Sequence, residues 1–138
     1  MPSVFFLLIA ILLVGILVFV AIILTGKRTH DFDKEKYQVD FLKIENALTK
    51  EDASSHAMAI IEGDKLLDRA MMEMGVPGKT MGDRLKKVGS KFESVNSVWY
   101  VHKIRNNIAH EHGYKVDYNQ AKHALNTYRK ALKDLGAI

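Results

Sequence analysis

The hydrophobic and polar positions divide the chain into an apolar start and an amphipathic remainder. Residues 4–24 form an unbroken run of 21 Val, Phe, Leu, Ile, Ala or Gly residues without a charge. At about 1.5 Å per residue, a helix of this length is roughly 30 Å long, which matches the hydrocarbon thickness of a bilayer. No basic residue precedes the run and no small-residue cleavage pattern follows it. The pattern therefore favours a transmembrane anchor over residues 1–25 rather than a cleaved signal peptide.

The flanks of this run predict its orientation. Lys27 and Arg28 follow it directly, in a short polar juxtamembrane linker over residues 26–32. Because basic residues concentrate on the cytoplasmic side of a membrane, we expect the N-terminus outside and the remainder inside. The expected protein is a single-pass protein of the cell membrane that contacts the lipid bilayer through residues 4–24.

Beyond the linker, apolar residues recur at helical spacing and no stretch shows the alternation of a strand. Three capping-box patterns mark expected helix starts: Thr49 with Asp52, Thr80 with Asp83, and Asp117 with Gln120. The expected helices cover residues 33–48, 49–74, 80–88, 94–112 and 117–135. We therefore predict an all-α fold, in which residues 33–138 form a compact bundle of about four to five helices.

Composition narrows the possible chemistry. The chain contains no cysteine, so disulfides, thiolate metal ligands and thiol nucleophiles are excluded. Its formal net charge of +4 is compatible with an anionic partner. No residue pattern predicts a metal site or a cofactor.

The segment over residues 99–111 carries the candidate chemistry. On a helical wheel, His102, Asn106 and His110 form one polar stripe turned away from the apolar face, and Arg105 lies at its border. Imidazoles beside a fixed cation and an amide could serve acid–base chemistry on a phosphodiester. A solvated helix face would show the same pattern.

A second polar position lies inside an apolar stripe. Asp64 interrupts the buried face of its expected helix, and a buried carboxylate needs a partner. Arg105 and Arg84 are the natural candidates. The pattern favours a structural role for Asp64, in support of the site together with His102.

Basic residues gather ahead of this segment. Five cations lie within thirteen residues against a single Asp83: Lys79, Arg84, Lys86, Lys87 and Lys91. Such a patch could bind RNA phosphates. It could equally bind anionic lipid at the inner leaflet, because the anchor would hold the domain close to the membrane.

The sequence around Arg105 resembles the HEPN superfamily. Arg105-Asn106-x-x-x-His110 is similar to the R-N-x-x-x-H form of its signature, and residues 59–68, 80–86 and 102–111 resemble small bacterial HEPN-like proteins. The resemblance covers roughly residues 33–135 and implies a metal-independent endoribonuclease that acts as a homodimer. By position it implies that Arg105 stabilises the phosphate, that His110 is the general acid or base, and that Asn106 is the polar residue after the arginine.

A non-catalytic reading stays open beside the enzyme. Arg105 and His110 lie about 140° apart on the wheel, so one helix face does not present both, and a dimer would have to bring them together. Many members of the superfamily bind nucleotides or proteins without catalysis. The alternative is therefore a membrane-tethered helical bundle for dimerisation or for binding a protein or nucleotide partner.

Overall fold

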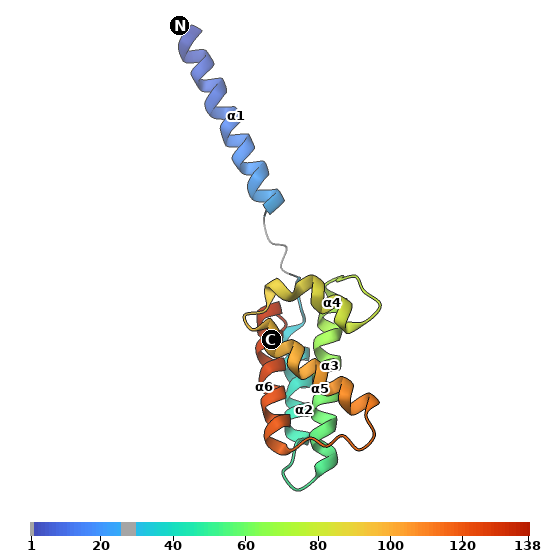
Figure 1. Ribbon diagram of the computed structural model, residues 1–138. Coiled ribbons are helices and arrows are strands. Elements are labelled where there is room, and N and C mark those ends of the chain that lie inside the picture. Colours follow the sequence, from blue (N-terminus) through green and yellow to red (C-terminus); the bar gives the residue numbers. More distant parts are fainter. Residues whose placement is uncertain (1, 26–29) are drawn as a thin grey trace.

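The computed structural model describes residues 2–25 and 30–138, and every regular element in this part of the chain is a helix (Figure 1). The predicted all-α class is confirmed. Lys27 and Arg28, on which the predicted orientation depends, lie outside the described residues. Of the expected linker, residues 30–32 are described, and Phe32 among them is buried against the helices.

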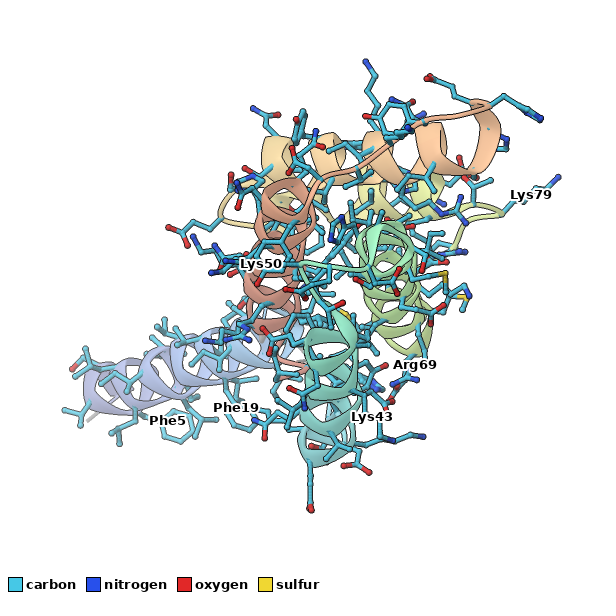
Figure 2. The ribbon with its side chains drawn as sticks, turned by 90° about the horizontal axis from the view of Figure 1, so that it is seen from below. Phe5, Phe19, Lys43, Lys50, Arg69 and Lys79 are labelled. Carbon is cyan, nitrogen blue, oxygen red and sulfur yellow. The ribbon has the colours of Figure 1, made fainter. Side chains whose placement is uncertain are left out.

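Helix α1 (Pro2–Thr25) is the apolar segment. Within it, Ser3–Thr25 is long and apolar enough to cross a membrane, and none of this segment is buried inside the protein. A side chain such as Phe5 or Phe19, both labelled in Figure 2, is more than half exposed, as expected for a helix that faces lipid. A signal sequence would pass the same test of length and composition.

The remaining helices form the predicted bundle. They are α2 (Lys34–Ala47), α3 (Ala53–Glu73), α4 (Met81–Val88), α5 (Val95–His110) and α6 (Tyr118–Leu135), with a 3₁₀ turn, η1 (Gly89–Lys91), after α4. Compared with the predicted bounds, α3 begins four residues later and α5 ends two residues earlier.

Two of the three expected capping boxes are present. Thr80 and Asp83 exchange side-chain and backbone hydrogen bonds at the start of α4, and Asp117 and Gln120 do so at the start of α6. The prediction for Thr49 was wrong. Asp52 caps α3, accepting a hydrogen bond from the backbone N–H of Ser54 at 2.9 Å.

Thr49 is held in the preceding turn instead. Its backbone N–H donates to Ser55 Oγ at 3.1 Å, and its carbonyl oxygen lies 2.8 Å from His56 Nε2. These contacts bind Thr49 through its backbone, so the residues between it and Asp52 do not enter the helix.

Helix α3 is the centre of the bundle: it packs along α6 and also contacts α2, α5 and α4. The largest fully buried side chains come from all five bundle helices: Tyr37, Ile60, Leu67, Met71, Leu85, Val101, Tyr128 and Leu132. Gly63 makes the close approach of α3 to α6 possible, because a Cβ atom there would lie 2.4 Å from Cδ2 of Tyr128. On α5, Val101 and Ile104 are buried, and Ile108 is half-buried at the edge of the core.

The two ends of the bundle carry different segments. Figure 1 shows α4 and the C-terminal end of α6 at the end where the chain enters the domain. The α2–α3 connection, which carries Lys50, lies at the opposite end.

Candidate functional site

The candidate residues on α5 belong to one polar cluster around Asp64. The Asp64 side chain, on α3, is 5% exposed and therefore needs hydrogen bonds to offset its desolvation. One carboxylate oxygen, Oδ1, lies 3.0 Å from His102 Nδ1 and accepts a hydrogen bond from the Tyr128 hydroxyl at 3.3 Å. The other, Oδ2, lies 3.6 Å from Arg105 Nε. Three helices, α3, α5 and α6, thus supply one buried polar group.

The hydrogen bonds extend from Asp64 toward the surface in a fixed direction. Because a carboxylate only accepts, the proton between it and His102 belongs to Nδ1. The other ring nitrogen, Nε2, is then an acceptor for the Asn106 amide nitrogen at 3.3 Å. The Asn106 oxygen in turn accepts from Arg105 Nη1 at 3.2 Å. Asn106 is therefore oriented by His102 and orients Arg105.

Tyr128 contributes a donor that the sequence did not single out. Burial raises the pKa of its hydroxyl well above the ordinary value, and the charge of Asp64 raises it further. The hydroxyl therefore stays protonated and donates to Asp64. Its position on the apolar face of α6 gave no sign of this role.

Arg105 lies at the boundary between this cluster and solvent. Its side chain is 31% exposed, and its Nη1 is bonded to Asn106. Its Nε is buried and makes no hydrogen bond within the described residues, because 3.6 Å to Asp64 Oδ2 is an ion-pair distance and exceeds hydrogen-bond range. The guanidinium is thus held on its inner side while about a third of the side chain faces water.

His110 stands apart from the cluster. It is exposed in the last turn of α5, and no hydrogen bond joins it to Arg105 or Asn106 in the described part of the chain. One copy of the chain therefore does not bring the imidazole of His110 together with the guanidinium of Arg105.

The expectation for His102 needs correction. The wheel placed it with His110 on a stripe turned away from the core, but His102 is buried and only His110 is exposed. The reason is Asp64, which offers a buried partner from another helix. His102 therefore supports Asp64 and Asn106 from within the bundle.

Arg84 also departs from its expected place in the basic patch. It is buried, and its Nε and Nη2 donate to the two oxygens of Asp68 at 2.6 and 2.8 Å. Its Nη1 donates to the carbonyl of Gly78 at 2.6 Å. These three hydrogen bonds tie the α3–α4 connection to α3. The Arg84 guanidinium is therefore not accessible to a ligand.

The four lysines of the patch are all exposed, but they do not share one surface. Lys87 and Lys91 line cavities near His30, at the end where the chain enters the domain. Lys79 and Lys86 do not line them, and Figure 2 shows Lys79 projecting from the loop before α4, away from the helices.

Fold and cluster together define a class: an all-helical bundle with a buried carboxylate–imidazole–amide–guanidinium cluster, behind an N-terminal helix that could span a membrane. The chain matches no protein-family model, no curated protein and no solved structure.

Proposed function

We propose that this protein is a membrane-anchored, HEPN-like endoribonuclease that acts as a homodimer and without a metal ion. The observation that carries the proposal is the Arg105 guanidinium, which is held on its inner side by Asp64 and Asn106. Arg105 lies on α5, and the same helix also displays His110. This arrangement supplies a pre-oriented cation for a phosphate and an exposed imidazole for proton transfer.

The chemistry assigned to these groups is phosphodiester cleavage by the RNA's own 2′-hydroxyl. The 2′-oxygen attacks phosphorus, the bond to the 5′-oxygen breaks, and a 2′,3′-cyclic phosphate forms. One proton leaves the 2′-hydroxyl and one is delivered to the departing 5′-oxygen, which is the task of His110. Arg105 stabilises the charge that develops on the phosphate oxygens. A two-fold pairing would supply His110 from one copy and Arg105 from the other.

The test is RNA cleavage by the full chain in detergent with EDTA present, using a mixture of RNAs. Wild type should cut, and His110→Ala should lower the rate by about 100-fold or more, as expected for loss of a general acid or base. His112→Ala is the matched control, because His112 is exposed two residues further on and should be within a few-fold of wild type. Equal activity of the two variants would remove His110 from the mechanism.

A non-catalytic, membrane-tethered bundle that binds a partner is the second candidate, and one observation favours it. Arg105 already pairs with buried Asp64 inside a single chain, so its charge has a structural use. Arg105→Ala removes the pairing with Asp64 under either candidate, so cleavage is the measurement that separates them. The ribonuclease predicts that wild type cleaves RNA and that the folded variant does not. The non-catalytic bundle predicts that neither cleaves RNA, while the variant still melts at a lower temperature because Asp64 has lost its cation.

A further inference from the structure

Residues 30–32, directly before the start of α2, are fixed to one end of the bundle. Phe32 is buried, with its ring 5.3 Å from the Tyr37 ring, centroid to centroid. His30 Nε2 lies 3.3 Å from Glu73 Oε1 at the end of α3. The domain is therefore attached to its tether through a defined surface.

The tether is short. Only five peptide steps separate Thr25, the last residue of the apolar helix, from His30. Fully extended, they reach roughly 18 Å. With Ser3–Thr25 in a bilayer, the surface around His30 is thus kept within a few Debye lengths of the lipid headgroups, since that length is about 8 Å at physiological ionic strength.

The surface around His30 is basic and hollow. A cavity of about 740 Å³ opens beside it, and a neighbouring one of about 610 Å³ shares His30 and Lys91. Four lysines contribute to the two linings: Lys34, Lys87, Lys91 and Lys133. All four are exposed, and none forms an ion pair with another described residue.

The acidic groups at this end do not cancel the lysines. The cavity linings include two carboxylates, Asp31 and Asp134. Glu73, which contacts His30, adds a third, so the four lysines stand against three carboxylates and the lysines remain in excess. The sequence adds two more cations, Lys27 and Arg28, between the apolar helix and His30. The excess of positive charge therefore lies at the end of the domain nearest the membrane.

We propose that this surface, Lys34, Lys87, Lys91 and Lys133 around His30, docks on anionic phospholipid headgroups of the leaflet that the domain faces. Each lysine at a negatively charged membrane surface favours the docked state by about fivefold, and a basic hollow can admit a phosphate headgroup. The inference rests on the membrane anchoring proposed above and is independent of RNA cleavage.

Lipid is a better match to this surface than RNA. The tether keeps the four lysines next to the bilayer, where a long polyanion would be excluded by the membrane and repelled by its charge. Of the cations that the sequence placed in one patch, Lys79 and Lys86 line neither cavity and remain available outside this surface.

The absence of cysteine makes the docking measurable at one site. Ser90 lines the larger cavity and is exposed, so Ser90→Cys can carry an environment-sensitive fluorophore in the full chain. The labelled protein is placed in nanodiscs of phosphatidylcholine alone, or of phosphatidylcholine mixed with phosphatidylglycerol. Quenching by headgroup-attached quenchers reports how close the label lies to the lipid.

We expect strong quenching only in the discs that contain phosphatidylglycerol, and its loss at high salt. Replacing Lys87 and Lys91 together by Glu should lower the ratio of docked to undocked protein by about 25-fold or more. The matched control replaces Lys115 and Lys122, two exposed lysines in the α5–α6 connection and the N-terminal half of α6, by Glu and should leave quenching unchanged. Unaltered Trp99 fluorescence and melting temperature would show that both variants are folded.

Two results would overturn the proposal. Equal quenching in neutral and anionic discs would show that the lysines do not select anionic lipid. A Lys87 and Lys91 reversal that weakens binding of an added RNA but leaves quenching intact would assign these lysines to RNA. Retention of the protein on washed nanodiscs is measured before any quenching. Loss of the protein at that step would refute the membrane anchoring itself.

Discussion

At the scale of single residues, Tyr37 connects α2 to the end of α3. Its hydroxyl donates to Glu73 Oε2 at 2.6 Å, and the Arg69 guanidinium lies over its ring at 4.7 Å. Burial and the bond to Glu73 raise the pKa of Tyr37 to about 12. The same hydrogen bond lowers the pKa of Glu73. Arg69 lowers the pKa of Asp40 likewise, through a hydrogen bond at 2.6 Å.

These lowered carboxyl pKa values predict sensitivity to acid. A carboxyl whose pKa is lower in the folded state stabilises the fold when ionised, so its contribution is complete above the ordinary pKa of 4.5 for Glu73. The contribution is lost as the pH falls through the lower folded-state pKa. Tyr37→Phe should cost about 1 kcal/mol at pH 7, and this difference from wild type should shrink below pH 4.5.

Thermal unfolding between pH 7 and pH 3, followed by the fluorescence of the single tryptophan, Trp99, would test this prediction. Tyr100→Phe is the control, because the Tyr100 side chain is exposed and makes no side-chain hydrogen bond within the described residues. A difference between Tyr37→Phe and wild type that stays constant down to pH 3 would mean that Glu73 is not the group concerned.

The candidate site could be predicted from the sequence only in part, because the partners of its side chains lie on neighbouring helices. A wheel gives the direction of a side chain on its own helix, so Asp64 could be recognised as inward-facing and Arg105 or Arg84 proposed as its partner. Of these two, Arg105 pairs with Asp64 and Arg84 pairs with Asp68. The wheel does not show what a neighbouring helix offers. For that reason His102 was assigned to solvent and Arg84 to a ligand surface, whereas Asp64 and Asp68 on α3 hold them.

At the scale of helices, the contact of α3 with α6 depends on one missing methyl group. Alanine is a better helix former than glycine by about 1 kcal/mol, so Gly63→Ala would stabilise an isolated α3. In the bundle the new Cβ would meet the Tyr128 ring at 2.4 Å, and overpacking of this kind costs about 1–3 kcal/mol or more. We expect net destabilisation, visible as a lower denaturation midpoint.

Gly82→Ala is the matched comparison. Gly82 lies in α4, and a Cβ there would be 3.8 Å from its nearest neighbours, Thr80 and Trp99, which is ordinary contact. Only the helix-forming term then remains, and the midpoint should rise by the equivalent of up to about 1 kcal/mol. If both alanine variants shift the midpoint in the same direction, the close approach of Tyr128 does not determine the effect at Gly63.

The helices themselves were largely predictable because their first turns are capped by residues close by in the sequence. The boxes at Thr80 and Asp117 need only residues three positions apart, and both formed. At Thr49 two capping residues compete, and Asp52 prevails because Ser55 and His56 bind Thr49 through its backbone. His56 also contacts the carbonyl of Val116 at 3.2 Å, a tertiary contact that no local pattern contains.

At the scale of the whole molecule, orientation in the membrane is the first property to measure. Lys27 and Arg28 predict a cytoplasmic domain, so a tag fused after Ile138 should resist external protease in intact cells. Replacing both residues by Gln and adding Lys after Met1 should weaken or invert this orientation. Digestion of the wild-type tag in unpermeabilised cells would contradict the assignment. A mature mass lacking the apolar segment would identify a signal sequence instead.

The short tether also restricts how two copies could pair. Helix α3 has 21 residues and is about 31 Å long, whereas the five peptide steps from Thr25 reach only roughly 18 Å. Two copies anchored in one leaflet must therefore both keep their His30 ends within roughly 18 Å of it. If each bundle also stands with this end docked on the lipid, the rotation axis of a symmetric pair is perpendicular to the membrane plane and head-to-foot pairs are excluded. Diffusion in two dimensions would bring copies together already aligned, so assembly would respond to the number of copies per membrane area.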